Sequence, residues 1–265
     1  MKRLRVFFLI CSFLSSGVAS AQYYNTGQDP ASLKWMQIKT GRFTVIYPKS
    51  YGQAGIDFAR SLDDAWSKLA NLNPEKKFRI PVIIHNYTTK YNGYVALAPK
   101  RMEIYPSPEQ NSIPLDPNTQ LAIHELTHVL QLESLNKGFT KAMSYIAGQQ
   151  FTGIVFSLVP LWFLEGDAVF SESVFTGSGR GRTPSFQKQL KAMMIEKGGV
   201  YKYDKSVNGS FRDFVPDHYQ YGYQMTAWSY VKYNPDMWKK ALNLTAGAPF
   251  LINPVNLSLR KSASL

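Results

Sequence analysis

The chain has 265 residues, of which 45% are apolar and 14% aromatic, with 30 Lys and Arg against 18 Asp and Glu. This composition excludes a disordered or collagen-like protein, and the length suits one large domain or two small ones. The formal net charge of +12 leaves nucleic acids and anionic membranes open as partners.

The first 21 residues are typical of a secretory signal peptide. A basic start at residues 2–5 precedes an apolar core at residues 6–14, and Ala19-Ser20-Ala21 is a small-residue cleavage site. The mature chain is expected to begin at Gln22, with 27 basic and 18 acidic residues and a net charge of +9. The alternative is an uncleaved anchor, for which the apolar run is short.

Removal of the signal peptide also removes Cys11, the only cysteine. The mature domain then has no disulfide, so packing or a bound metal must hold it together. We expect an exported protein of the periplasm or outer cell envelope of a bacterium, or a secreted one.

The first half of the chain is rich in strand patterns. Residues 22–34 are polar and form an expected exposed lead-in. Alternating apolar and polar residues around Thr40-Gly41 predict a hairpin, and helical spacing of apolar residues follows it. The predicted elements are strands at 35–39 and 42–47, a helix at 51–72, and strands at 79–85, 94–98 and 102–105.

The second half is helical. Asp116-Pro117 is a helix start, with Asp as the N-cap and Pro at the first helical position. The predicted helices are 118–135, 138–157, 161–175, 184–197 and 218–233. Strands followed by helices predict an α+β fold. We expect one domain at residues 35–248. It has a strand-rich part up to residue 135 and a helical part from residue 136.

Two segments have alternative interpretations. Residues 151–164 are almost wholly apolar but too few to cross a membrane, so a buried helix is favoured over a membrane-facing surface with peripheral contact. Residues 177–182 form a Gly-rich basic loop, for which a solvated connector is favoured over phosphate or nucleic-acid binding. No nucleic-acid motif accompanies the positive charge, so no nucleic-acid partner is expected.

His124-Glu125-Leu126-Thr127-His128 is an H-E-x-x-H sequence within a predicted helix. Its i, i+4 spacing places both imidazoles on one helix face, where they can bind one Zn²⁺. Glu125 lies beside them and can accept a proton from water. Half of the histidines of the chain lie here, which favours a site over two core histidines.

A hydrolytic zinc ion needs a third protein ligand and an open position. Glu165 follows an apolar run, where a lone carboxylate needs a cation, and we predict it as that ligand. His85 and His218 are alternatives without helpful spacing, and a surface carboxylate at a helix start is the structural alternative.

The sequence from His124 to His128, followed by Trp162-Phe-Leu-Glu165-Gly166-Asp-Ala-Val-Phe-Ser-Glu172, resembles the gluzincin metallopeptidases, specifically peptidase MA-like domains. The likeness spans residues 35–235. It implies a zincin-like fold, with a mixed sheet above an active-site helix and a helical second lobe. It also implies zinc held by His124, His128 and Glu165, with Glu125 as general base and a peptide or protein as substrate.

Two weaker roles follow from this resemblance. Tyr219 occupies the place of a tyrosine whose hydroxyl stabilises the tetrahedral oxyanion in the aminopeptidase branch, while simple packing is the alternative. Glu172 lies seven residues after Glu165, on nearly the same helix face, and is predicted to hold a ligand histidine, unless it is a solvated carboxylate.

The chain also departs from the family. Zinc aminopeptidases bind the substrate amine with a Gly-x-Met-Glu-Asn strand, whereas this chain has Lys100-Arg101-Met102-Glu103-Ile104. An endopeptidase is therefore favoured over an aminopeptidase. Met102, Glu103 and Ile104 are still predicted to bind substrate from an edge strand. Val169 stands where thermolysin-like enzymes have an acid, so the chain is not expected to be thermolysin itself.

The main alternative function is a non-catalytic binding or structural module of the cell envelope that keeps the zincin fold. Residues 249–265 are interpreted as a C-terminal tail or the start of a further domain. Related MA-like domains can precede a β-propeller, so a longer protein is one expectation.

Overall fold

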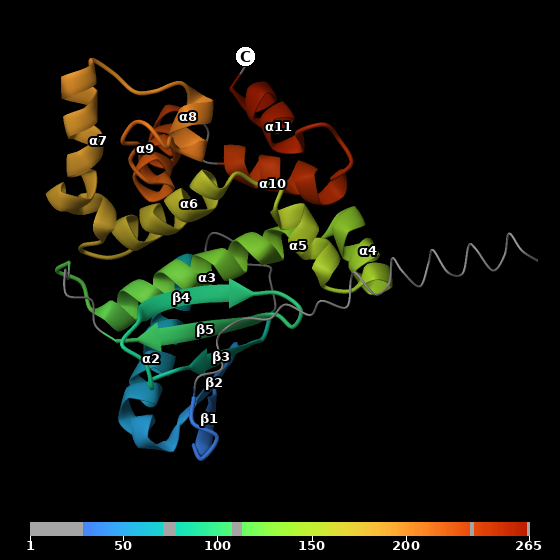
Figure 1. Ribbon diagram of the computed structural model, residues 1–265. Coiled ribbons are helices and arrows are strands. Elements are labelled where there is room, and N and C mark those ends of the chain that lie inside the picture. The colour runs from blue at the N-terminus through green and yellow to red at the C-terminus, as the bar shows by residue number, and fades with distance from the viewer. Residues whose placement is uncertain (1–28, 71–77, 108–112, 234–235, 264–265) are drawn as a thin grey trace, which may run out of the picture. The chain divides into compact units, whose positions relative to one another are not determined.

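The computed structural model describes residues 29–70, 78–107, 113–233 and 236–263 (Figure 1). Residues 34–265 form one compact unit, separate from residues 1–33. The expected signal peptide, Cys11 and the expected mature start at Gln22 lie outside the described residues.

A mixed five-stranded sheet forms the first part of the compact unit. Its strands are β1 (Trp35–Lys39), β2 (Phe43–Pro48), β3 (Ile80–Ile84), β4 (Tyr91–Ala96) and β5 (Arg101–Pro106). Their spatial order is β1-β2-β3-β5-β4. The two outer pairs, β1 with β2 and β4 with β5, are antiparallel, while β2, β3 and β5 run parallel. In the described part of the chain, β4 is therefore an edge strand and β5 is an inner one.

Two helices cover one face of the sheet, α2 (Gly52–Leu69) and α3 (Pro117–Leu135). Alternate residues of β3 and β5 face these helices, and Ile84, Met102 and Ile104 are fully buried with Leu62 and Leu126. Burial of this apolar surface supplies the main driving force for folding of the sheet with α2 and α3. Helix α3 runs alongside the edge strand β4 (Figure 1).

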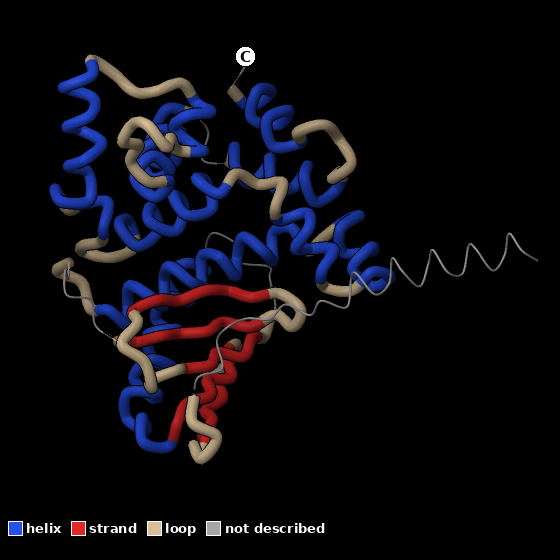
Figure 2. Tube along the Cα trace, in the orientation of Figure 1, coloured by secondary structure: helices blue, strands red, loops and turns tan. Residues whose placement is uncertain are grey.

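The second part is helical. Its helices are α4 (Gly138–Ala147), α5 (Gln150–Phe156), α6 (Leu161–Val174), α7 (Pro184–Lys197), α8 (Tyr203–Asn208), α9 (His218–Lys232), α10 (Met237–Gly247) and α11 (Pro254–Ser262). Figure 2 shows the strands gathered together and these helices on the other side of α3. Ten α-helices and five strands in the described residues make the chain an α+β protein.

Helices α6 and α9 meet backbone to backbone. A Cβ added at Gly166 would lie 2.2 Å from the carbonyl carbon of Gly222, and one added at Gly222 would lie 1.9 Å from the carbonyl oxygen of Trp162. Both positions therefore need glycine because no side chain fits between the helices. This contact sets the position of Glu165, which precedes Gly166 on α6.

Most of the predicted elements are confirmed, but the helix expected at 138–157 is wrong. The structure has two helices there, because Gly148 adopts a φ of +79° that ends α4. Strand β4 begins three residues before the predicted strand. Helices α8 and α10 were not anticipated, and the expected tail contains α11, which packs against α10.

No single helix in the described ranges is long and apolar enough to cross a membrane. Helices α5 and α6 pass that test of length and composition only as a pair, and they are bent by 90° at the break between them.

We predict that Gly222→Ala lowers the free energy of unfolding by about 3 kcal/mol or more, because the methyl group meets backbone atoms that cannot move aside. Urea unfolding followed by tryptophan fluorescence measures the change. Gly247→Ala is the matched control, since nothing lies within 4 Å of a Cβ built there and α10 continues to that residue. Equal unfolding midpoints for Gly222→Ala and the unsubstituted protein would contradict the close contact.

Candidate metal centre

Helix α3 supplies the first two side chains of the site. Its start is well defined, because the Asp116 carboxylate accepts a hydrogen bond from the backbone N–H of Thr119 at 2.8 Å and Pro117 occupies the first turn. The helix is buried along most of its length between the sheet and α6. His124 and His128, one turn apart, therefore project from a helix that is packed on both sides.

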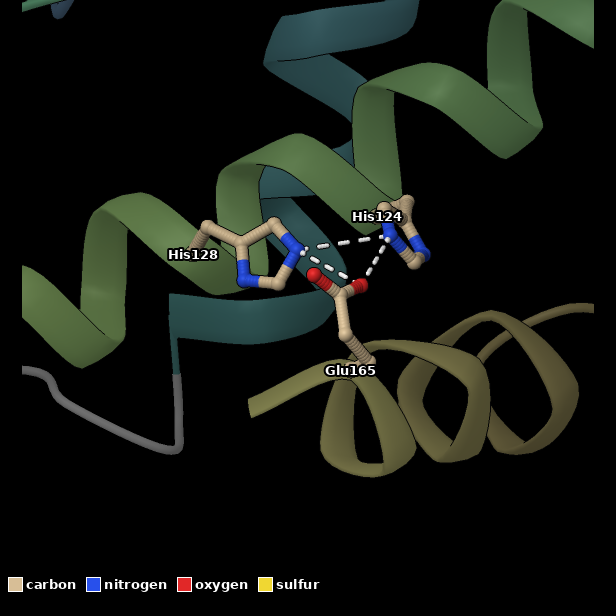
Figure 3. A group of neighbouring side chains, drawn as sticks. All are labelled: His124, His128 and Glu165. Carbon is tan, nitrogen blue, oxygen red and sulfur yellow. Dashed lines mark hydrogen bonds and ion pairs between the residues drawn. The ribbon is translucent and has the colours of Figure 1, made fainter. Parts of the chain in front are cut away.

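Helix α6 brings Glu165 to the same point (Figure 3). The Nε2 atoms of His124 and His128 lie 3.3 Å apart. One carboxylate oxygen of Glu165, Oε2, lies 3.3 Å from Nε2 of His124 and 3.4 Å from Nε2 of His128. The three atoms thus form a nearly equilateral triangle. The structure brings together the three residues that the sequence predicts as metal ligands.

The dimensions of this triangle fit a metal ion. Ligand atoms around a tetrahedral ion with bonds of about 2.0–2.1 Å are separated by about 3.3–3.4 Å, which matches the three distances. The Oε2 atom of Glu165 is also buried without a hydrogen-bond partner among the described residues. A cation bound by the triangle would compensate that oxygen. His124, His128 and Glu165 are therefore placed to hold a metal ion.

The ionisable groups of the triangle shift one another's pKa values. Burial opposes the charge on the imidazole of His128, yet the adjacent Glu165 carboxylate outweighs it and raises the pKa of His128 to about 9. Burial likewise opposes charge on Glu165, but the adjacent His124 and His128 outweigh it, so the pKa of Glu165 is lowered. The carboxylate is thus ionised at neutral pH, as a metal ligand must be.

Glu125 lies next to the triangle, and its pKa is shifted in the opposite direction to that of Glu165. It is buried, and its Oε2 has no hydrogen-bond partner in the described ranges. Desolvation raises the pKa of this carboxyl group, while the neighbouring His124 and His128 act in the opposite direction. The edge strand leaves room for it, because a Cβ at Gly93 would lie 2.7 Å from Cγ of Glu125. A carboxylate with a raised pKa beside a candidate metal ion suits proton transfer.

His128 is oriented by a side chain that the sequence analysis missed. The Nε2 of Gln131 donates to the carbonyl of Leu164 and to Asp167, each at 3.0 Å, which leaves Oε1 of Gln131 to face Nδ1 of His128 at 2.9 Å. Nδ1 must then carry a proton, so Nε2 of His128 is the nitrogen that can give up its proton and bind a metal ion in the triangle. Asp167 is in turn held by the hydroxyl of Tyr230 at 2.9 Å.

His124 has two neighbours at its other ring nitrogen. Nδ1 of His124 lies 2.9 Å from Nη2 of Arg180 and 3.6 Å from Oε2 of Glu172. Glu172 is fully buried and pairs with Nε of Arg180 at 2.6 Å. Because arginine only donates, the two contacts of Nδ1 correspond to different tautomers. The Arg180 contact is within hydrogen-bond distance, whereas the Glu172 contact is an ion-pair contact. A tautomer with the proton on Nδ1, facing Glu172, would leave the Nε2 lone pair of His124 for a metal.

The position of Glu172 therefore agrees with the predicted contact to a ligand histidine. Burial opposes its charge, but the adjacent Arg180 outweighs this and lowers the pKa of Glu172. Arg180 belongs to the short 3₁₀ turn η3 (Arg180–Arg182) of the Gly-rich loop. The expectation of a solvated connector at residues 177–182 is wrong, because the buried Glu172 draws this loop inward. A buried carboxylate that needs a cation was the signal available in the sequence.

Tyr219, at the start of α9, also reaches the site. Its ring centroid lies 6.3 Å from that of His124, and the Arg180 guanidinium lies 5.2 Å from the centre of the Tyr219 ring. Burial, followed by the negative charge of Glu165, raises the pKa of Tyr219. The hydroxyl therefore stays protonated at neutral pH and can donate a hydrogen bond.

A cavity of about 230 Å³ opens over these residues. Gly93 and Tyr94 of β4 line one wall and Leu161 and Leu164 of α6 line another, while Glu125, Arg180 and Tyr219 reach into it. The candidate metal ligands thus lie at a cleft between the sheet edge and the helical half.

The predicted edge strand is wrong. Met102, Glu103 and Ile104 lie on β5, which is enclosed between β3 and β4. Met102 and Ile104 are fully buried in the core, and Glu103 faces the opposite side of the sheet, where it is bound by Arg101 and Tyr94. The strand that borders the cavity is β4. The apolar residues at 102–105 indicated a strand, but they could not indicate which strands lie beside it.

No protein-family model matches this chain, and no curated protein matches it in sequence.

We predict that the chelator-treated protein loses stability as the pH rises from about 6.5 to about 9. The raised pKa of His128, about 9 against 6.5 in the unfolded chain, contributes stability that is present below pH 6.5 and lost as the pH passes through the folded value. The loss is up to about 3 kcal/mol. Urea unfolding at a series of pH values measures it.

The control for this pH dependence is His218→Gln, which should retain it, whereas His128→Gln should remove it. A metal ion displaces the same proton, so apparent metal affinity should rise over this pH range. Identical pH dependence in His128→Gln and in the unsubstituted protein would show that His128 is not the titrating group.

Proposed function

We propose that this chain is an exported zinc-dependent peptidase of the gluzincin type. The observation that carries the proposal is the buried Glu125 carboxylate, which lies beside the triangle of His124, His128 and Glu165 at a cleft. A structural zinc site is usually closed by four protein ligands, whereas three ligands and a cleft suit a catalytic one. The resemblance of the sequence to peptidase MA-like domains and the α+β layout support the same assignment.

Zinc bound by the three residues would polarise a substrate carbonyl and lower the pKa of water toward about 7. Glu125 takes the proton from the attacking water and passes it to the leaving amine. Its raised pKa brings it closer to the value at which both transfers are efficient. The protonated hydroxyl of Tyr219 donates to the oxyanion as charge develops on it.

Substrate would align on β4. This strand borders the cavity, and an extended peptide can add to a sheet edge through main-chain hydrogen bonds. The Glu103 carboxylate accepts hydrogen bonds from Arg101 and Tyr94 on the far face of the sheet. This arrangement favours an endopeptidase over an aminopeptidase. A free substrate amine therefore has no partner in Glu103.

We predict that Glu125→Gln keeps stoichiometric zinc and lowers the rate of casein or peptide hydrolysis by about 10²–10⁴-fold, because only the proton acceptor is lost. Metal analysis and a hydrolysis assay with and without chelator measure the two quantities. Glu196→Gln, on α7, is the matched control. Stoichiometric zinc in the unsubstituted protein with no cleavage of any peptide in a library would favour the non-catalytic envelope module instead.

We predict that Tyr219→Phe lowers kcat at least about tenfold and leaves zinc content and KM nearly unchanged, because its hydroxyl acts only as charge develops in the transition state. Tyr221→Phe is the control, since the hydroxyl of Tyr221 on the same helix contacts Met193. Equal kcat values for the two variants would remove Tyr219 from the mechanism.

A further inference from the structure

An exposed apolar surface lies away from the metal centre, where α4 meets the loop after α10. On α4, Phe139, Ala142 and Ile146 follow an i, i+3, i+7 spacing and are all exposed, so the apolar face of this helix points to solvent. Ile146 is 80% exposed. A surface helix normally turns such a face to the core.

The loop between α10 and α11 extends the same surface. Phe250 and Ile252 are 71% and 97% exposed, and Leu251 lies between them. The rings of Phe139 and Phe250 are 5.7 Å apart in an edge-to-face arrangement, which joins the loop to α4. We call Phe139, Ala142, Ile146, Phe250, Leu251 and Ile252 the α4–α10 surface. Contiguous exposed apolar residues of this kind mark an interaction site, unlike scattered single ones.

The charges around this surface have one sign. Residues 136–164 and 237–265 contain no Asp or Glu. They contain six basic residues, Lys137, Lys141, Lys239, Lys240, Arg260 and Lys261. Lys137 and Lys141 lie at the start of α4 itself, whereas the basic side chains of α10 and α11 lie at the ends of those helices away from the loop. The α4–α10 surface is therefore apolar, its immediate basic neighbours are Lys137 and Lys141, and the segments that form it carry no acidic residue.

We propose that the α4–α10 surface binds the surface of an anionic phospholipid bilayer. Exposed aromatic and aliphatic side chains enter the boundary between headgroups and acyl chains, while Lys and Arg remain among anionic headgroups. A second copy of this chain fits the surface poorly, because pairing the surface with itself brings Lys137 and Lys141 toward like charges with no acidic partner in these segments.

This proposal places a membrane contact outside residues 151–164, where the sequence analysis left one open. A buried helix was favoured for residues 151–164, and Val155, Val159 and Phe163 are buried in the helical core. Ile154, Leu158 and Leu161 of the same segment are exposed, but no basic residue lies within it. The exposed apolar side chains that neighbour basic residues lie instead on α4 and in the loop after α10. The proposal does not depend on the metal centre or on peptidase activity.

The test is flotation of the protein with phosphatidylcholine vesicles and with vesicles that also contain phosphatidylglycerol. It uses a chain that begins at Gln22, which omits the apolar run at residues 6–14 and retains the compact unit of residues 34–265. We expect binding to the anionic vesicles that weakens with added salt, and little binding to the neutral ones.

Two pairs of variants separate the contributions of apolar and basic residues. Ile146→Ser with Ile252→Ser should lower vesicle binding about tenfold or more, and so should Lys137→Gln with Lys141→Gln. The matched controls are Ile195→Ser, at a residue of α7 that is 82% exposed, and Lys188→Gln with Lys191→Gln on the same helix. These controls should bind as the unsubstituted protein does.

Equal binding to neutral and anionic vesicles would overturn the proposal, as would equal loss in the α7 controls. Absence of vesicle binding together with a dimer that dissociates in Ile146→Ser/Ile252→Ser would assign the surface to a second copy instead. Unfolding midpoints equal to that of the unsubstituted protein confirm that each variant is folded, since the substituted side chains lie at the surface.

Discussion

The contact between α6 and α9 at Gly166 and Gly222 is the constraint on which the candidate site depends. It brings two helix backbones together without intervening side chains. Glu165 immediately precedes Gly166, and Tyr219 lies one turn before Gly222. The same contact therefore sets the distance from α3 of Glu165, the candidate metal ligand, and of Tyr219. A larger residue at either glycine would separate these side chains from His124 and His128.

Charge balance explains why the site tolerates so many buried ionisable groups. The carboxylates of Glu165 and Glu172 are ionised because imidazoles and Arg180 compensate them, whereas Glu125 has no such direct partner and its pKa is raised. Neighbouring carboxylates thus differ in state according to their partners. This separation suits the proposed roles of Glu165 as a metal ligand and of Glu125 as a proton acceptor.

The sequence predicted those features that depend on local patterns. The hairpin of β1 and β2, the capped start of α3 and the pair His124 and His128 all follow from short-range spacing. The order of strands does not, because alternation identifies a strand but not its neighbours, and β5 was mistaken for an edge. Gln131 and Arg180 were also missed, since each acts through a partner more than 30 residues away.

The central claim is that His124, His128 and Glu165 hold a zinc ion that faces Glu125. Anomalous diffraction at the zinc absorption edge, from crystals of the protein grown with zinc, tests it most directly. We predict one strong anomalous peak about 2.0–2.2 Å from Nε2 of both histidines and from a Glu165 oxygen, with the Glu125 carboxylate facing the open coordination position. A peak bound by other residues, or Glu125 as a fourth ligand that closes the site, would contradict the account.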